Sequence, residues 1–394
     1  MMQTPVYLDN HATTRVDPRV VAAMLPYFTE KYGNPASTSH ALGAECHDAI
    51  EQARHTIARS LHADPSEIVF TSGATESNNL ALRGLTEHRR RKGRHIVSVQ
   101  TEHKSVLDPL RRLERQNVAV TLLPVAPQTA RVPGRLDVQQ LVDSLTPDTF
   151  LVSVMLANSE IGVLQPLAEI GACCRQQGIA LHCDATQAVG RLPVDVQSLQ
   201  VDLLSFSGHK LYGPKGVGAL YVRREFRARL ASQLDGGGQE RGTRSGTLNV
   251  TGIIGLARAI ELCVTELDAE QRRIGALRQR LWDRLQQLVP GAQLNGPPLE
   301  DAHLRLRGNL NCYFPGVEGS ALMIAAPEVA FSTGSACSSH NPEPSHVLRA
   351  LGLDVDLVRS SVRFGLGRFT TEDEIDWAAE RLAAAVHRLR HHPL

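Results

Sequence analysis

The sequence predicts an α/β protein in which a large domain with a mostly parallel, seven-stranded sheet is joined to a smaller α+β domain. Short apolar runs rich in β-branched residues alternate with longer helical patterns between about residues 65 and 225. That alternation is typical of a parallel sheet covered by helices on both faces. The length of 394 residues exceeds what one compact core usually holds, so a second domain is expected.

Seven short apolar runs are the strand candidates of this sheet. They span residues 67–72, 95–100, 118–125, 149–156, 179–184, 201–207 and 216–222. Helical patterns lie between them, and Gly178 has the position of a helix C-cap in one of these patterns. An earlier amphipathic pattern at 43–61 predicts a helix that packs on the sheet.

The pattern changes after residue 260. A long, charged helical segment is followed by the strand-like run NLNCYF, a Gly/Ser-rich loop and a final amphipathic helix that begins at Glu372. We therefore expect residues 15–259 to form the large domain. Residues 1–14 and 260–394 are expected to form the small one.

Composition narrows the classes of partner. The chain has 42 Lys and Arg against 41 Asp and Glu, and this net charge of +1 gives no electrostatic reason to bind nucleic acid or an anionic membrane. The N-terminus lacks the apolar core of a secretory signal, and no apolar stretch approaches the ~18–20 residues of a membrane span. We expect a cytoplasmic protein without a membrane or a direct nucleic-acid partner.

The seven cysteines do not form a pattern typical of disulfides or metal sites. Their number is odd and no CxxC pair occurs, which argues against a disulfide framework and against a structural zinc ion. Most of them are expected to be small buried side chains. Cys337 differs because it lies in the polar stretch FSTGSACSSHNPEP, a position that suits a reactive thiol. The others are Cys46, Cys173, Cys174, Cys183, Cys263 and Cys312.

Polar motifs follow several of the predicted strands, where ligands of parallel sheets bind. TSGATES at 71–77 opens a helix and can hold an anion on its backbone N–H groups, although a plain helix cap has the same composition. Asp184 ends a strand, either as a turn-forming residue or as the partner of a protonated ring nitrogen. Lys210 ends the next strand beside Ser207 and His209, either as a surface charge or as an amine that forms a Schiff base. Together the anion site, the acid and the amine are what pyridoxal phosphate requires.

The full set of motifs resembles the NifS/IscS-type cysteine desulfurases, which are pyridoxal-phosphate enzymes of fold-type I within the class V aminotransferase family. The resemblance rests on YLDNHATT, TSGATES, TEHKS, DATQ, SFSGHKLYGPKG, GGGQERGTRSGT, STGSACSS and VRFGLGRFTTEDEID. These motifs extend from residue 7 to residue 376, nearly the whole chain.

The resemblance implies a role for each matching residue of the cofactor site. Lys210 would hold pyridoxal 5'-phosphate as a Schiff base, and Asp184 would keep the ring nitrogen protonated. His103 would stack on the ring and assist proton transfer; a histidine that only satisfies the core is the common alternative, and the TEHKS motif favours the functional role. The remaining contacts would come from Ala74, Thr75, Ser207 and His209 at the phosphate, Gln187 at the phenolic oxygen and, across the interface of a homodimer, Thr247.

The resemblance also implies the substrate and the reaction. Arg363 would bind the carboxylate of L-cysteine as a bidentate fork, with an interdomain salt bridge as its alternative role. Asn34 would line the substrate pocket. Cys337 would attack the substrate sulfur and keep it as a persulfide, which releases L-alanine. The sulfur would then pass to an acceptor protein for iron–sulfur cluster assembly or for thiolation of a cofactor or nucleic acid.

One position departs from the family pattern. In LANSEIG the family has a second asparagine, which contacts the phenolic oxygen, where this chain has Ser159. A lost contact of this kind costs about 1 kcal/mol, so weaker cofactor tuning is expected. Two alternatives remain open: another pyridoxal-phosphate aminotransferase or lyase of this fold, and a weakly active homologue. The tail of the housekeeping bacterial form, which helps to bind the scaffold, is longer than RLRHHPL, so the acceptor stays open among iron–sulfur scaffolds, nitrogenase-type scaffolds, tRNA-thiolation carriers and DNA-phosphorothioation partners.

Overall fold

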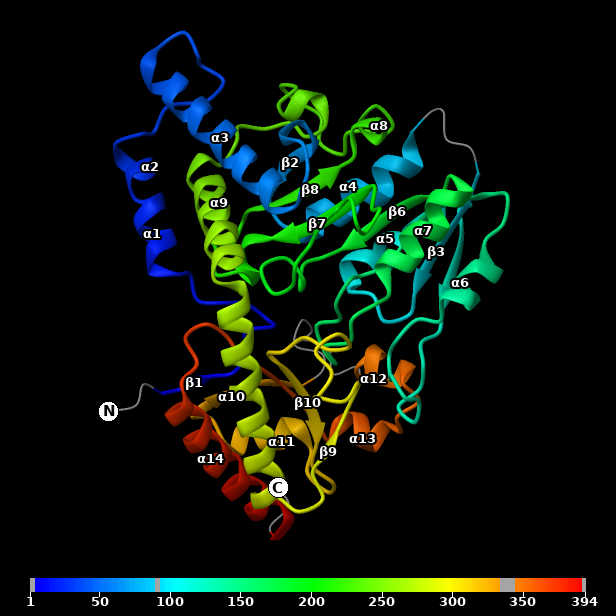
Figure 1. Ribbon diagram of the computed structural model, residues 1–394, viewed down its shortest axis with the longest axis vertical. Helices are drawn as coiled ribbons and strands as arrows, with labels where there is room; N and C mark the ends of the chain where they lie inside the picture. The colour runs from blue at the N-terminus through cyan, green and yellow to red at the C-terminus, as the bar shows by residue number, and fades with distance from the viewer. Residues whose placement is uncertain (1–3, 89–92, 334–343, 392–394) are drawn as a thin grey trace.

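The computed structural model describes residues 4–88, 93–333 and 344–391, and it has two domains. In Figure 1 the seven-stranded sheet lies in the upper part of the molecule, and the smaller domain lies below it, joined by the long helix α10. The residues near the N-terminus cross into the lower domain, where β1 lies close to α10 and α14.

The large sheet has the seven predicted strands. Their order is β2-β8-β7-β6-β5-β3-β4; β8 is antiparallel to both neighbours and the other pairs are parallel. Each strand lies within its predicted run, so the prediction of a mostly parallel seven-stranded sheet is confirmed. The strands are β2 (Ile68–Thr71), β3 (His95–Val99), β4 (Ala119–Leu123), β5 (Thr149–Ser153), β6 (Ala180–Asp184), β7 (Leu203–Ser207) and β8 (Gly218–Val222).

Helices cover both faces of this sheet because side chains alternate between its faces. Val97 and Val152 belong to one apolar core, together with residues of α3 and α9, whereas Ile96 and Leu151 belong to a second core, together with residues of α4 and α5. Helix α7 ends where Gly178 adopts a φ of +68°, a conformation that favours glycine. The helices of this domain are α1 (Pro18–Met24), α2 (Pro26–Thr29), α3 (Ala41–Ser60), α4 (Ala74–Glu87), α5 (Lys104–Glu114), α6 (Val138–Ser144), α7 (Leu167–Gln177), α8 (Arg224–Arg227) and α9 (Val250–Thr265).

The small domain is built on an antiparallel sheet of order β12-β13-β10-β9, and β1 pairs with β11 beside it. Helices α10 and α14 pack on its apolar core. The strands are β1 (Val6–Tyr7), β9 (Gln293–Leu294), β10 (Asn309–Tyr313), β11 (Val329–Ala330), β12 (Ser332–Thr333) and β13 (Ser361–Gly365). The helices of the C-terminal part are α10 (Leu267–Leu288), α11 (Gly319–Ala325), α12 (His346–Ala350), α13 (Val355–Arg359) and α14 (Glu372–His391).

The apolar cores of the large and the small domain divide the chain differently from the predicted domain border. The border between residues 259 and 260 falls inside α9, and Ile260 and Cys263 on that helix still pack in the core of the large domain. Val347 and Val358, from α12 and α13, belong to the same core. The apolar face of α9 continues past residue 260, so the boundary between the two domain cores follows the packing of this helix and not the change in sequence pattern at that residue.

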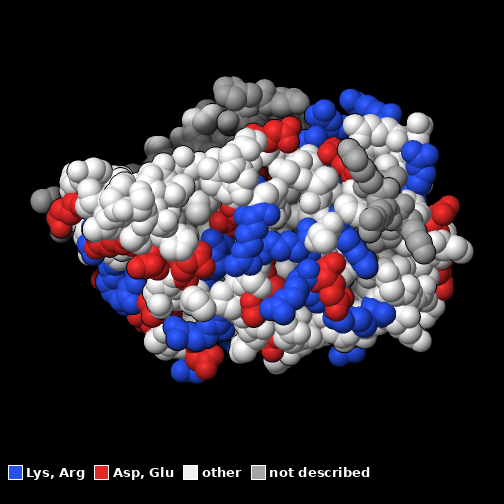
Figure 2. Space-filling model, turned by 90° about the horizontal axis from the view of Figure 1, so that it is seen from above, with Lys and Arg blue, Asp and Glu red and all other residues white. Residues whose placement is uncertain are grey.

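Three features bear on the expectations from composition: the surface charge, the apolar character of the helices and the side chains able to bind a metal. On the face shown in Figure 2, basic and acidic side chains lie near one another, with basic ones gathered in a band across the middle. Within the described ranges, no helix combines the length and the apolar character that crossing a bilayer requires. The same part of the chain holds no cluster of His, Cys, Asp and Glu suited to a metal ion.

The expectation of buried cysteines is confirmed for Cys46, Cys174, Cys183, Cys263 and Cys312, and Cys173 is half-buried.

Candidate active site

A cavity of about 690 Å³ lies between the two domains, beyond the carboxyl ends of β6 and β7. Most of its wall comes from the large domain, and β13 and the segment before α12 contribute from the C-terminal part. The cavity brings together most of the predicted site residues: Ala74, Thr75, His103, Ser159, Asp184, Gln187, Ser207, His209, Lys210 and Arg363.

One end of the cavity is a narrow turn before α4. Gly73 has a φ of +152°, and α4 begins at the next residue, so its first N–H groups face the cavity wall. Ser207 lies close to this turn, since a Cβ built on Gly73 would be 3.6 Å from its Oγ. His209 lines the same cavity as Ser207. Burial and the positive charge of Lys210 lower the pKa of His209 to about 4. This end therefore presents neutral donors and a helix N-terminus, which suits an anionic group.

Lys210 is the last residue of a 3₁₀ turn that follows β7. Its Nζ donates hydrogen bonds to the main-chain carbonyls of His11, at 2.5 Å, and Ala12, at 2.6 Å. Those residues belong to the loop between β1 and α1. The amine is thus held at the cavity wall by backbone groups.

Asp184 ends β6 and is 6% exposed. Its carboxylate accepts hydrogen bonds from Asn78 Nδ2 at 2.8 Å and from the backbone N–H of Thr186 at 3.0 Å. Asn78 is itself fixed by a bond of 2.9 Å to Ser105 Oγ. The carboxylate therefore has a set orientation at the cavity wall.

His103 is the N-cap residue of α5. Its Nδ1 accepts a hydrogen bond from the backbone N–H of Ser105 at 3.1 Å and lies 2.8 Å from Ser105 Oγ. Because Nδ1 accepts, the ring proton of the neutral form is on Nε2. The cap fixes the plane of a ring that forms part of the cavity wall.

Arg363 lies on β13 and its side chain is buried. Nη2 donates to Asp9 Oδ1 at 2.8 Å, and Nη1 donates to the main-chain oxygen of Ser159 at 3.2 Å. Nε is buried and has no hydrogen-bond partner within the described residues. Asp9 and Arg363 both belong to the predicted small domain, so their ion pair is not the interdomain salt bridge named as the alternative role. The contact of Arg363 with the large domain is its hydrogen bond to the Ser159 carbonyl.

Two buried carboxyl groups near the site were not predicted from the sequence. Glu160 lines the cavity, accepts a bond of 2.5 Å from Ser345 Oγ, and has its pKa raised to about 7 by burial. Glu102 accepts a bond of 2.6 Å from the backbone N–H of Met155, and burial and the charge of Asp184 hold its pKa well above the ordinary value. The sequence did offer a signal for both glutamates, because each is adjacent to a predicted site residue. Glu102 precedes His103 in TEHKS, and Glu160 follows Ser159 in LANSEIG.

The structure does not bring every predicted residue to this cavity. Asn34 and Thr247 line a separate pocket of about 390 Å³. Asn34 Oδ1 accepts a turn-forming bond of 3.0 Å from the backbone N–H of Ala36. Within one chain these two residues are therefore not neighbours of Lys210. Cys337 lies outside the described residues.

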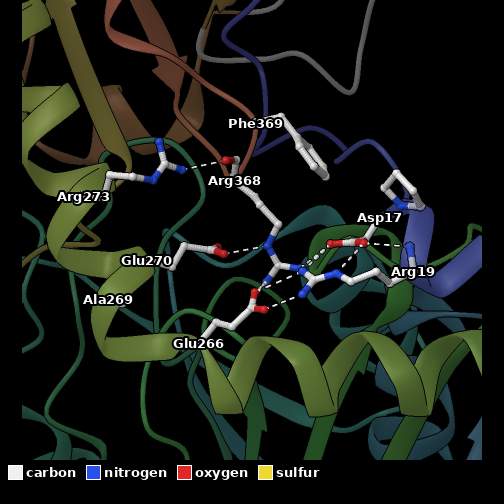
Figure 3. A pocket seen from close by; sticks show the side chains of 9 residues that line it. Asp17, Arg19, Glu266, Ala269, Glu270, Arg273, Arg368 and Phe369 are labelled. Carbon is white, nitrogen blue, oxygen red and sulfur yellow. Dashed lines mark hydrogen bonds and ion pairs between the residues drawn. The ribbon is translucent and has the colours of Figure 1, made fainter.

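A third pocket lies near the junction of the domains and has a different character (Figure 3). We call five of its six charged residues the junction cluster: Asp17, Arg19, Glu266, Glu270 and Arg368. Arg368 forms ion pairs with Asp17 at 2.8 Å and with Glu270 at 2.6 Å, and Arg19 pairs with Asp17 at 2.8 Å. Since these charges neutralise one another, the pocket lacks an obvious role in binding a charged ligand.

Comparison with known proteins gives a consistent result. The sequence model of the class-V aminotransferases matches residues 6–377. Cysteine desulfurase IscS of Anaeromyxobacter dehalogenans (strain 2CP-C) is 54% identical over 389 residues, which cover 99% of this chain and 94% of the relative. Cysteine desulfurase IscS of Rickettsia rickettsii (strain Iowa) is 47% identical over 98% of this chain and 92% of the relative.

Solved structures agree. A NifS-like protein superposes with a TM-score of 0.88 at 37% identity and covers 97% of this chain and 99% of its own. SspA in complex with cysteine superposes with a TM-score of 0.80 at 34% identity, covering 93% of this chain and 100% of its own. DndA from Streptomyces lividans does so with a TM-score of 0.75 at 38% identity, covering 92% and 99%.

Proposed function

Because this chain belongs to the class-V aminotransferase family and, within it, to the NifS/IscS-type cysteine desulfurases, we propose that its cavity converts L-cysteine to L-alanine and that the sulfur is passed on from Cys337. The observation that carries the proposal is the meeting of the Lys210 amine, the fixed Asp184 carboxylate and the Arg363 guanidinium at one cavity.

The residues of the cavity fit pyridoxal 5'-phosphate. Lys210 supplies the amine for a Schiff base, Asp184 the partner for the ring nitrogen, and the turn at Gly73 the anion site for the phosphate. Thr186 Oγ1 is buried without a hydrogen-bond partner among the described residues, which is costly unless a ligand satisfies it. When bound, the cofactor supplies a ring that accepts the electrons of the substrate's α-carbon.

The protein groups would divide the remaining tasks by their geometry. Arg363, whose guanidinium is oriented by Asp9, binds the carboxylate of L-cysteine and so places its amino group toward Lys210. His103, whose Nδ1 is occupied by Ser105, presents Nε2 as the atom that moves protons.

Cys337 lies beyond the described residues, but both described ends of its segment adjoin the cavity. Strand β12 pairs with β13, where Ser332 is the partner of Arg363, and Pro344 and Ser345 line the cavity wall. We therefore propose that the Cys337 thiolate attacks the substrate sulfur and that the electron pair of the carbon–sulfur bond leaves with the β-carbon, which takes up a proton on the way to L-alanine. The sulfur stays on Cys337 as a persulfide. An acceptor protein, such as an iron–sulfur scaffold or a sulfur carrier, then takes this sulfur.

Thr247 and Asn34 have a place in this proposal only in a homodimer. In one chain they line another pocket, and we propose that Thr247 reaches the phosphate of the neighbouring subunit and that Asn34 lines a substrate pocket completed by the dimer. Mixed dimers would test this role: a Thr247→Ala subunit and a Lys210→Ala subunit should complement each other in part.

The activity is tested by the yield of L-alanine from L-cysteine in the wild type and in Cys337→Ser. We expect alanine formation to fall by on the order of 10²-fold or more in the variant, because the sulfur acceptor is lost. Cys173→Ser, at a half-buried cysteine of α7, is the matched control and should keep wild-type activity. Equal alanine formation in Cys337→Ser would favour the alternative of an aminotransferase or lyase.

Ser159 bears on the alternative of a weakly active homologue. Its side chain lines the cavity at the place where the family has asparagine. Ser159→Asn should tighten cofactor binding by roughly fivefold, because one further hydrogen bond contributes about 1 kcal/mol. Absorbance titration with the cofactor and sulfide release measure the two effects. If neither protein turns over when fully loaded with cofactor, the enzymatic proposal fails.

A further inference from the structure

The side chain of His11 has no role in the site described so far, although His11 forms part of the cavity wall. It lies in the loop between β1 and α1 and is 2% exposed. Its Nε2 is buried and has no hydrogen-bond partner among the described residues. A buried polar atom without a partner destabilises a fold, so its presence in a ligand cavity points to a group that the protein holds ready.

The other side of the ring is fixed by Gln187. His11 Nδ1 lies 3.1 Å from Gln187 Oε1, and Gln187 Nε2 donates to the main-chain oxygen of His11 at 3.0 Å. Arg191 donates to the same Gln187 oxygen. Arg191 Nη1 also lies 3.3 Å from His11 Nδ1, slightly farther away than Gln187 Oε1. Because an amide oxygen only accepts, we assign the ring proton to Nδ1 from the closer contact, which leaves the lone pair on Nε2.

These contacts determine which way the Gln187 amide faces. A rotation by 180° would place its oxygen against the His11 carbonyl and its NH₂ group against Nδ1–H and Arg191. Both contacts would then be repulsive. One N–H of Gln187 is therefore used on His11, and the second N–H is left for a ligand in the cavity.

The backbone of His11 also contacts Lys210. Its carbonyl accepts the hydrogen bond of 2.5 Å from Nζ that holds the amine at the cavity wall. His11 thus touches both residues that flank one edge of the proposed cofactor ring, Gln187 at the phenolic oxygen and Lys210 at the neighbouring carbon. The charged groups that face the imidazole are Arg191, Arg363 and Lys210, and burial with these charges lowers the pKa of His11 well below its ordinary value.

We propose that His11 is a positioning residue of the cofactor site: its ring orients the Gln187 amide so that an N–H faces the phenolic oxygen, and its carbonyl holds the Lys210 amine whenever that amine is not joined to the cofactor. This inference rests on the proposed function and deepens it. A donated hydrogen bond stabilises negative charge on the phenolic oxygen. The donor thereby competes with the proton on the neighbouring lysine–cofactor nitrogen for the charge of this oxygen. Weakening the hydrogen bond leaves more of that charge to hold the proton, so it should raise the pH at which this nitrogen loses its proton.

The test uses His11→Phe, which keeps a planar ring without nitrogen atoms, and His11→Asn, which keeps a short donor. The measurements are the cofactor dissociation constant, from titration of the apoprotein with pyridoxal phosphate, and the pH midpoint of the visible absorption of the Lys210-bound cofactor. His11→Phe should weaken cofactor binding by roughly fivefold and raise the midpoint by about half a pH unit. His11→Asn should return both values toward those of the wild type.

The matched control is His95→Phe. His95 is also buried, on β3, but its two ring nitrogens contact Thr149 and Thr121, away from the cavity. This variant should lower the melting temperature without moving the pH midpoint. His11→Ala carries the same expectation as His11→Phe, so the test does not depend on one variant folding.

The outcomes separate this inference from the function on which it rests. If the wild type binds the cofactor but folded His11→Phe and His11→Ala have the wild-type midpoint, the role of His11 is wrong and the proposed function stands. If the wild type never forms the coloured complex, the proposed function itself is wrong.

Discussion

The cavity and the junction cluster are both polar, and both join parts of the chain that lie far apart in sequence, but they use polarity in opposite ways. In the junction cluster, Arg368 faces Asp17 and Glu270, and Arg19 faces Asp17 and Glu266 (Figure 3). In the cavity, by contrast, buried polar atoms have no hydrogen-bond partner among the described residues. They are His11 Nε2, Thr186 Oγ1 and Arg363 Nε.

This difference indicates where the fold has been shaped by stability and where by binding. Buried charges that are paired hold two segments together, and removing one partner leaves the other costly to bury. Unpaired donors and acceptors lower stability unless a ligand satisfies them. Changes in the cavity should therefore mainly affect chemistry, and changes in the junction cluster should mainly affect stability.

The largest effect is expected in the cavity. Lys210→Ala removes the amine that would hold the cofactor, and we expect kcat/KM for L-cysteine to fall on the order of 10³-fold. The free energy of unfolding of the apoprotein should change little, because the lysine contacts two backbone carbonyls at the edge of a cavity. Lys31→Ala, at a surface ion pair with Glu45, is the control for loss of a lysine. Retention of more than about a tenth of the activity would contradict the role of Lys210.

The junction cluster should show the opposite response. Arg368→Met keeps much of the side-chain volume but leaves Glu270 and part of Asp17 without a cation. We expect the free energy of unfolding to fall by about 3 kcal/mol, measured by urea unfolding, since one partner of a largely buried set is lost. Arg280→Met removes an exposed arginine paired with Asp376 and should be well tolerated. An equal loss of unfolding free energy in the two variants would show that burial of the junction cluster does not add to the stability of the protein.

The sequence was sufficient for the sheet and for the residues at its strand ends. The seven runs were recognised because β-branched residues and short apolar segments are local signals. Asp184 and Lys210 followed from the rule that ligands lie beyond the carboxyl ends of parallel strands. The cavity between them was therefore predictable in position.

The features that the sequence did not predict depend on contacts between segments that are distant in the chain. Gln187 lies 176 residues after His11, and no local pattern indicates that the two side chains meet. The raised pKa values of Glu102 and Glu160 follow from burial, which a single glutamate in the sequence does not reveal. Asn34 was assigned to the substrate pocket from a motif alone, and in one chain it lies elsewhere. The domain border failed to coincide with packing for a similar reason, since α9 continues across it.

The finest distinction is how two carboxyl groups respond to pH: Glu102, which is buried near the cavity, and Asp17, which belongs to the junction cluster. Burial and the charge of Asp184 raise the pKa of Glu102, so folding takes up a proton once the pH exceeds the ordinary value of 4.5. Stability from this group is complete at lower pH and is lost as the pH rises toward the folded pKa. Glu102→Gln removes the titration, so its stability relative to the wild type should increase as the pH rises above about 5, by at most about 1.4 kcal/mol per pH unit.

Asp17 in the junction cluster should behave in the reverse sense. The hydrogen bonds from Arg19 hold its pKa below the ordinary value of 3.8, so its contribution is present above that value and is lost as the pH falls through the folded pKa. Asp17→Asn, which keeps the N-cap of α1, should be less stable than the wild type at neutral pH, and the difference should shrink in acid. Urea unfolding of both variants at several pH values measures the two slopes. Slopes of the same sign would contradict the contrast between Glu102, a buried acid without an ion pair among the described residues, and Asp17, an acid held by arginines.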